Sequence, residues 1–275
     1  MSTFHLTVLV DNKTARPDLA PEHGFSLWIE SPDARVLFDT GQGPALPHNA
    51  TRLGLRLHEA SAIVLSHGHY DHTGGLACAL DQNKKAPIYL HPEALRPRFS
   101  RHADQTMHAI GMPPGITERL RALPERTLWT TQPVEISRHM WTTGPIPRET
   151  SFEDTGGSFF LDEHGTTPDP IQDDQALWME TAQGLVVILG CAHSGVVNTL
   201  SHISKLTGAR TFHAVMGGLH LGSASPERLA ATVEALSRYH MSVLGPAHCT
   251  GAAEFLAKHV SNLIVECGTG KTFVI

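Results

Sequence analysis

The sequence has few cysteines, no long apolar run and no export signal. Its four cysteines (Cys78, Cys191, Cys249 and Cys267) show no C-x-x-C spacing, so we expect reduced thiols rather than a disulfide framework. No apolar run approaches the roughly 20 residues that a membrane span needs, which excludes a membrane-spanning helix. The N-terminal segment lacks the basic stretch and apolar core of a signal peptide. We therefore expect a cytoplasmic protein without a membrane partner.

Basic runs are also absent. The chain carries 21 Lys and Arg against 27 Asp and Glu, a formal net charge of -6, which argues against a nucleic-acid partner. With 41% hydrophobic and 17% charged residues among 275, the composition is typical of a globular protein able to bury a full core. We find no internal repeat. We expect a single domain over residues 1–275, and the sequence does not indicate its oligomeric state.

Alternating and helical patterns predict two groups of strands, each followed by helices. Helices are expected at His48–Leu57, Gly75–Leu80, Val196–Leu206, Pro226–Tyr239 and Glu254–His259. Strands are expected at Phe4–Val10, Phe25–Glu30, Arg35–Phe38, Ala62–Leu65, Pro87–His91, within Trp129–Thr143, and at Ser158–Leu161, Gln175–Thr181, Leu185–Leu189, Phe212–Met216, Ser242–Leu244, Asn262–Glu266 and Thr272–Ile275. This order predicts an α/β fold in which two sheets lie between helical layers.

The segment Glu93–Arg126 differs from the rest of the chain. It is rich in Arg, His, Pro and Met and has weak periodicity, so we interpret it as an insertion of short helices and loops outside the core that caps a site. Four apolar side chains could offer a wall to a flat ring, or pack only with one another: Phe99, Met107, Ile110 and Met112.

Four metal-competent side chains fall within six positions, in the pattern H-x-H-x-D-H formed by His67, His69, Asp71 and His72. The pattern directly follows the apolar strand candidate. In an extended chain, side chains two apart share a face, so His67, His69 and Asp71 are expected on one side and His72 on the other. That layout suits two metal ions better than one. Although 19 histidines make a chance match conceivable, it would occur in roughly one such chain in a few hundred.

Three later strands each deliver a histidine just past the carboxyl end. They are His193 in Gly190-Cys-Ala-His193, His220 in Gly217-Gly-Leu-His220 and His248 in Pro246-Ala-His248. Ligands gather at the carboxyl ends of strands in layered α/β folds, because the loops there converge on a crevice. The sequence therefore predicts a metal site built from both halves of the chain.

These motifs resemble the metallo-β-lactamase fold superfamily. The resemblance rests on Phe38-Asp-Thr-Gly41, on Ser66–Gly75 and on the later histidines. Further segments are similar to the branch named for an archaeal dihydropterin-ribofuranosylaminobenzene phosphate synthase: Leu9–Asn12, Glu22–Gly24, Leu37–Gln42, Asp173–Leu177, Gly190–Gly195, Gly217–Leu221 and His248–Gly251. The resemblance implies a four-layer αβ/βα sandwich that holds one or two divalent metal ions, zinc above all, with iron or manganese as alternatives.

The resemblance also implies a ligand set. His67 and His69 would hold the first metal, Asp71 and His72 the second, and His248 would complete the second site. The third ligand of the first site and the ligand that bridges the two metals are open among His193, which we favour, Asp174 and Cys191, because thiolate is also a good zinc ligand. A buried, inert Cys191 is the alternative. We predict Asp71 and His193 as the catalytic side chains.

Other residues are expected around the metals. By resemblance, Asp39 would fix the histidine loop by hydrogen bonds; otherwise it only forms a turn. His220 either lines the site or caps its own strand–helix turn. Asn12 and His23 would border a substrate pocket.

An anionic group of the substrate is expected near two further residues. Ser194 opens a helix whose free N–H groups suit a phosphate. Arg148 lies on a loop expected to border the site, or is simply a solvated charge.

Three functions remain open. The first is a metal-dependent hydrolase, a phosphodiesterase or esterase, in which a metal-bound hydroxide attacks a small, phosphorylated or anionic substrate. The second is a transferase like the synthase of the pterin branch, in which the metals activate a pyrophosphate leaving group. The third is a binding module without metal, against which the intact H-x-H-x-D-H pattern argues. The fold alone does not name the substrate.

Overall fold

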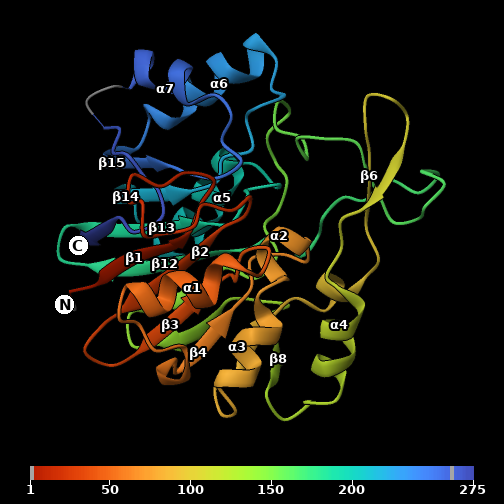
Figure 1. Ribbon diagram of the computed structural model, residues 1–275. Coiled ribbons are helices and arrows are strands. Elements are labelled where there is room, and N and C mark those ends of the chain that lie inside the picture. Colours follow the sequence, from red (N-terminus) through yellow and green to blue (C-terminus); the bar gives the residue numbers. More distant parts are fainter. Residues whose placement is uncertain (1–2, 261–262) are drawn as a thin grey trace.

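The structure of the protein is a computed structural model that describes residues 3–260 and 263–275 (Figure 1). A seven-stranded sheet has the order β16-β1-β2-β3-β4-β5-β8. Its strands are β1 (His5–Val10), β2 (Ser26–Glu30), β3 (Arg35–Phe38), β4 (Ala62–Val64), β5 (Ile88–Leu90), β8 (Thr127–Trp129) and β16 (Thr272–Val274). Strands β2 and β3 form an antiparallel hairpin, whereas β3, β4, β5 and β8 run parallel.

A six-stranded sheet has the order β15-β14-β13-β12-β10-β9. Its strands are β9 (Val134–Ser137), β10 (Met140–Thr142), β12 (Ala176–Thr181), β13 (Gly184–Leu189), β14 (Thr211–Gly217) and β15 (His240–Pro246). Strands β13, β14 and β15 run parallel, so their carboxyl ends share one edge. A small third sheet joins β11 (Phe159–Phe160), β6 (Phe99–Arg101) and β7 (Met107–Ala109).

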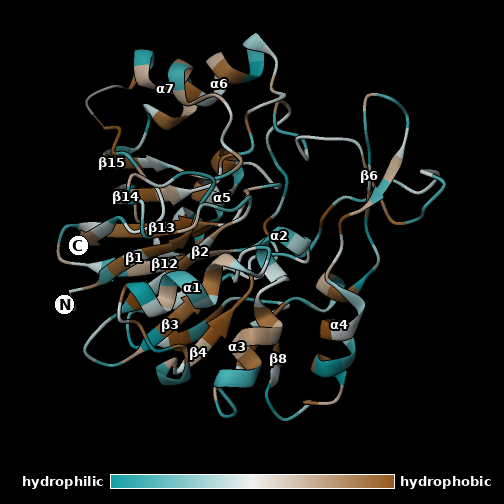
Figure 2. Ribbon diagram, in the orientation of Figure 1, coloured by the Kyte–Doolittle hydropathy of each residue, from teal (hydrophilic) through white to brown (hydrophobic). Residues whose placement is uncertain are grey.

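Helices cover the outer faces of the two large sheets (Figure 1). On the first sheet lie α1 (Ala45–Arg52), α2 (Tyr70–Thr73), α3 (Leu76–Gln82) and α4 (Pro114–Arg121), with short 3-10 turns at Leu57–Glu59 and Pro92–Leu95. On the second sheet lie α5 (Val196–Thr207), α6 (Pro226–Leu236) and α7 (Ala253–His259). Figure 2 shows the apolar strands inside and the polar helix faces outside.

Strand alternation builds the layers. In β3, Val36 and Phe38 face the core between the two sheets, whereas Leu37 faces the core under α1 and α3. In β13, Val186 and Ile188 enter that same central core, and their neighbours face the core under α5. Three hydrophobic layers therefore separate helix, sheet, sheet and helix, which is the predicted αβ/βα sandwich.

The segment Glu93–Arg126 is only partly the expected insertion. Met112, Ile116 and Leu120 are buried in the core under the first sheet, so the prediction that this segment lies outside the core is wrong for its second half. The amphipathic face of α4 explains the burial, since its apolar residues recur at helical spacing. Within this segment, the β6–β7 hairpin is the part that projects from the sandwich (Figure 1).

Several boundaries also differ from the prediction. The first helix begins at Ala45 and ends at Arg52, because Gly54 takes a left-handed conformation that stops it. The predicted strand Asn262–Glu266 begins at a residue outside the described part of the chain, and Ile264 forms only an isolated bridge to Leu244. No helix in the described residues is long and apolar enough to cross a membrane.

Candidate metal centre

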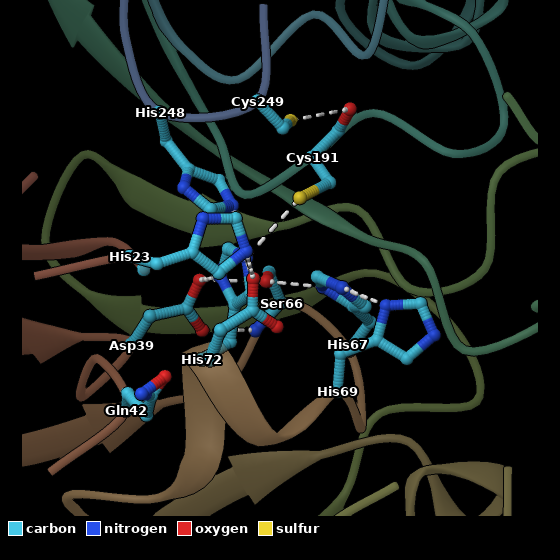
Figure 3. Close-up of polar contacts among 12 residues, drawn as sticks. His23, Asp39, Gln42, Ser66, His67, His69, His72, Cys191, His248 and Cys249 are labelled. Carbon is cyan, nitrogen blue, oxygen red and sulfur yellow. Dashed lines mark hydrogen bonds and ion pairs between the residues drawn. The ribbon is translucent and has the colours of Figure 1, made fainter. Parts of the chain in front are cut away.

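Loops at the carboxyl ends of strands from both sheets meet at one edge of the sandwich. The loop after β4 carries His67 and His69, and the loops after β13, β14 and β15 carry His193, His220 and His248. Figure 3 shows part of the resulting cluster of imidazoles and thiols. The convergence that the sequence predicted is thus present.

His67, His69 and His193 form one group. Their nearest ring nitrogens all lie within 4.8 Å of one another, and His67 Nε2 lies 3.0 Å from His69 Nδ1. All three side chains are buried. Burial, reinforced by neighbouring positive charge, holds the pKa of each imidazole well below its usual range, so each is neutral, the form that binds metal.

Two nitrogens of this group lack a partner among the residues that the structure describes. His69 Nε2 and His193 Nε2 are buried and accept or donate no hydrogen bond, although the other nitrogen of His193 contacts the Thr155 carbonyl at 2.8 Å. Buried polar atoms are nearly always paired, since an unpaired one costs about 1–3 kcal/mol. Unpaired imidazole nitrogens that converge beside a third histidine fit a divalent metal ion.

Asp71 and His248 form a second group with His23. Asp71 Oδ2 lies 3.2 Å from both His23 Nε2 and His248 Nε2, and His72 Nε2 lies 3.8 Å away. Burial opposes ionisation of Asp71, yet His72 and the hydrogen bonds from His23 and His248 hold its pKa well below the usual value. The carboxylate is therefore charged and oriented among imidazoles.

The extended-chain prediction placed Asp71 on the same side as His67 and His69, and it is wrong. Helix α2 begins at Tyr70, so the period of the chain changes from two to 3.6 within the motif. Asp71 turns toward His248 instead. His72 packs beside His67, with ring centroids 4.3 Å apart.

Asp39 connects the histidine loop to the end of β3. Its Oδ1 accepts from the Ser66 N–H at 2.7 Å, and its Oδ2 accepts from the Ser66 hydroxyl at 2.6 Å. The same Oδ2 lies 2.7 Å from His72 Nδ1. Asp39 is fully buried, so these contacts fix the His72 ring and leave its Nε2 toward the cluster.

Asn12 and Asp11 hold His248 in a comparable way. The Asn12 side-chain oxygen lies 3.0 Å from His248 Nδ1, and Asp11 Oδ1 accepts from the His248 N–H at 2.7 Å. Asn12 therefore positions a ring of the cluster. His23 borders the cavity, as does His220, whose ring lies 4.3 Å from that of His193.

Of the two other candidates for the open ligand positions, the structure brings Cys191 into the cluster and leaves Asp174 out. Cys191 Sγ lies 3.1 Å from His72 Nε2. Asp174 belongs to no group of ligand atoms in the described residues, and its Oδ2 accepts from the Ser194 N–H at 2.6 Å. Burial raises the pKa of Asp174 to about 6. Its carboxylate holds the loop after β13.

Several donors of the expected anion site at Ser194 and Arg148 are engaged within the protein, although both residues line a cavity. Ser194 is buried with its N–H bonded to Asp174, and the N–H groups of Val197 and Asn198 in α5 donate to the Glu153 carboxylate at 2.9 Å. The Arg148 guanidinium donates to the carbonyls of His193 and Pro170. Because these N–H and guanidinium donors are already paired within the protein, the N-terminus of α5 has few free N–H groups to bind a phosphate.

The cavity above the cluster has a volume of about 290 Å³. Ile110 of the hairpin segment and Phe159 of β11 supply its apolar side, and the Phe159 ring lies 5.4 Å from that of His69. Of the four apolar residues expected as a wall, only Ile110 lines this cavity. The expectation that Met112 contributes to this wall is wrong, because its side chain is buried in the core.

Two parts of the site escaped prediction. Arg98 is buried with Asp169 and Asp173, and Asp173 Oδ2 accepts from the Gly68 N–H at 2.7 Å. This network holds the histidine loop from the outside. Cys249, next to His248, lies in the cluster as well. An arginine in a polar segment is ordinarily expected to be solvated, so the sequence gives no sign that Arg98 is buried. Only the adjacent pair Asp173-Asp174 could have indicated a buried network of charges.

Comparisons with known proteins show what this chain is similar to. The profile described as the Metallo-beta-lactamase superfamily matches residues 19–199. The 7,8-dihydropterin-6-methyl-4-(beta-D-ribofuranosyl)-aminobenzene-5'-phosphate synthase of Methanocaldococcus jannaschii is 31% identical over 240 residues, 84% of this chain and 81% of that protein. The crystal structure of Tm1679, titled a metal-dependent hydrolase of the beta-lactamase superfamily, has a TM-score of 0.83 at 29% identity and covers 99% of both chains. A diphosphatase from the PhnP family shares only the fold, with a TM-score of 0.54 at 13% identity and coverage of 100% of this chain and 98% of the other.

Proposed function

Since the chain belongs to the Metallo-beta-lactamase superfamily, we propose that it is a metal-dependent hydrolase acting on a phosphoester or ester of a small, anionic molecule. One observation carries the proposal: the buried, unpaired nitrogens of His69 and His193 converge beside His67 at the floor of a cavity. The similar crystal structure titled a metal-dependent hydrolase supports the same reaction class.

The residues that would hold metal fall into two sets. His67, His69 and His193 would hold one ion. Asp71, His72 and His248 would hold a second, since their polar atoms converge around Asp71 Oδ2. Zinc is the metal we propose first, with iron or manganese as alternatives. A divalent ion bound there supplies Lewis acidity, which lowers the pKa of water and polarises a phosphoryl or carbonyl oxygen.

The remaining chemistry belongs to side chains of the protein. Asp71 accepts hydrogen bonds from His23 and His248, so we propose that it orients the nucleophile, and that His193 acts beside it as a ligand. His23 is 56% exposed at its side chain and borders the cavity, so its ring can contact a bound substrate. Among the described residues that line this cavity there is no lysine or arginine, and recognition of an anion falls to imidazoles and metal.

Metal analysis and a generic phosphodiester test the proposal together. The purified protein should bind at least one zinc, iron or manganese ion per chain and hydrolyse bis(p-nitrophenyl) phosphate. His69→Ala should lose this turnover, whereas His164→Ala, at an exposed histidine, should keep it. Less than one ion per chain after addition of each metal would contradict the enzyme and favour a metal-free binding module.

A transferase resembling the archaeal synthase is the second candidate, and the 31% identical relative favours it. Phe159 and Ile110 on the cavity wall offer an apolar surface to a flat ring. Saturable binding of a dihydropterin to the metal-loaded protein, without hydrolysis of the phosphodiester, would favour this reaction. The cytoplasmic location and the small-molecule partner stay predictions.

A further inference from the structure

Two thiols lie among the imidazoles of the metal centre. Cys191 Sγ, Cys249 Sγ and a ring nitrogen of His248 all lie within 4.8 Å of one another. Cys191 also belongs to a group with His67 and His72, and to a third with His193 and His220. Its sulfur therefore lies where the groups of candidate ligands overlap, as the close-up shows beside His72 (Figure 3).

The environment of Cys191 is unlike that of a packed cysteine. Cys267 is buried and belongs to the hydrophobic core between the sheets. Cys191 is 2% exposed, yet it belongs to none of the three hydrophobic cores described above. Buried free cysteines are ordinarily small apolar side chains, so a buried thiol surrounded by imidazoles calls for another explanation.

The backbone makes room for the second thiol. Gly218 lies between the loops after β13 and β15, and a Cβ there would overlap both the Gly190 carbonyl oxygen and Cys249 Sγ. The Cys249 thiol is directed toward Cys191, whose carbonyl oxygen lies 3.8 Å from that sulfur. His248 adopts a positive φ of 44°, so the chain turns sharply where it presents the ring and the thiol together.

We propose that Cys191 and Cys249 are thiolate ligands of this centre, so that it holds its metal through sulfur as well as nitrogen. The inference rests on the proposed metal-dependent function and adds the ligand class. Thiolates select borderline and soft ions, zinc and iron, over manganese and magnesium, which prefer oxygen. Zinc should therefore displace manganese from the loaded protein.

Cobalt(II) gives a direct test, because its visible bands report binding and its near-ultraviolet charge-transfer band reports thiolate ligation. Protein stripped of metal under a reducing agent should show both signals on addition of cobalt(II). The near-ultraviolet band should fall in Cys191→Ser and in Cys249→Ser and disappear in the double variant. Cys78→Ser is the matched control: this thiol contacts Gln82 on α3, and the band should be unchanged.

The outcomes separate this inference from the proposed function. Cobalt that binds without the near-ultraviolet band in the wild-type protein would overturn the thiolate ligands and leave the metal enzyme standing. No cobalt bound at all would overturn both. A disulfide between Cys191 and Cys249 in the metal-loaded protein, detected by thiol counting after unfolding, would also overturn the inference.

A measurement on the unaltered protein guards against variants that fail to fold. X-ray absorption at the zinc edge should show sulfur at about 2.3 Å in addition to nitrogen at about 2.0–2.1 Å. A shell of nitrogen and oxygen alone would overturn the thiolate ligands.

Discussion

Asp39 shows how one side chain can orient the residues of a candidate metal site that it does not itself join. It accepts hydrogen bonds from the Ser66 N–H and hydroxyl, and its Oδ2 also faces His72 Nδ1. Its backbone has a φ of 54°, which asparagine and aspartate tolerate better than other non-glycine residues. The residue type therefore suits both the turn and the contacts.

Asp39→Asn should weaken metal binding. An amide offers one acceptor oxygen where the carboxylate offers two, so it cannot satisfy Ser66 and His72 together. We expect a loss of about 10–100-fold in zinc affinity, the usual effect of removing a group that orients a ligand. Competition with a chelator would measure it. Asp33→Asn, at an exposed turn, is the control, and equal affinities of the two variants would contradict the role of Asp39.

At the scale of elements, close backbone contacts hold the histidine loop in place. Gly68 lies against the 3-10 turn Pro92–Leu95, where a Cβ would overlap the Ala94 carbonyl oxygen. Gly74 and Gly75 lie equally close to the carbonyls of Gln42 and Thr40. The loop between β4 and α3 is thus pressed between neighbouring backbones, which accounts for glycines at these positions.

Gly68→Ala should destabilise the protein, because the added methyl group has no space and the backbones must separate. We expect a loss of about 1–3 kcal/mol in the free energy of unfolding, measured by urea denaturation, together with weaker zinc binding. Gly115→Ala in α4 is the matched control, since nothing lies within 4 Å of its Cβ position. It should gain about 0.5–1 kcal/mol. A Gly68→Ala protein as stable as the wild type would refute the close contact.

A carboxylate from a distant loop caps the N-terminus of helix α5. Glu153 accepts from the N–H groups of Val197 and Asn198 and from the Thr150 hydroxyl. Burial raises the pKa of Glu153 above the ordinary value of 4.5, against the effect of these hydrogen bonds. The folded protein therefore binds this proton more tightly than the unfolded chain.

The free energy of unfolding should depend on pH through the protonation of Glu153. The contribution of Glu153 is fully present below pH 4.5 and is lost as the pH rises through the folded-state pKa. The free energy of unfolding of the wild type, minus that of Glu153→Gln, should therefore be larger at about pH 5 than at about pH 7. Taking the difference cancels the other titrating groups, which both proteins share. A difference that is constant or falls toward pH 5 would contradict the raised pKa.

On the scale of the whole molecule, the candidate centre joins the two sheets. His67, His69, Asp71 and His72 follow β4 of the first sheet, whereas His193 and His248 follow β13 and β15 of the second. A bound ion would connect segments more than a hundred residues apart in the sequence. Metal binding should accordingly stabilise the entire sandwich.

Removal of metal with a chelator should lower Tm, and added zinc should restore it. A ligand that binds only the folded state stabilises it by about 4 kcal/mol when its free concentration is about 1,000 times Kd. His193→Ala removes a proposed ligand supplied by the second sheet and should show a smaller rise in Tm with zinc, whereas the exposed-site variant His164→Ala should respond like the wild type. Equal responses would place the ion elsewhere.

Local features were predictable where a short segment carried the full signal. The H-x-H-x-D-H pattern, the β2–β3 hairpin and the histidines after β13, β14 and β15 are each readable within a few residues. The side on which Asp71 lies was not, because α2 starts inside the motif. The environment of Arg98 was not either, since its two carboxylate partners lie more than 70 residues away.

The sequence by itself determined the α/β sandwich, the family and the histidines that gather at the edge of the sheets, because strand period and ligand spacing are local properties. Only the tertiary structure decided which side chains share a metal group. It excludes Asp174 from the groups of candidate ligands by pairing its carboxylate with the Ser194 N–H. It also caps the N-terminus of α5 with Glu153 and brings Cys249 beside Cys191. These outcomes depend on contacts between distant loops, whose burial and hydrogen bonding are set by how the two sheets pack.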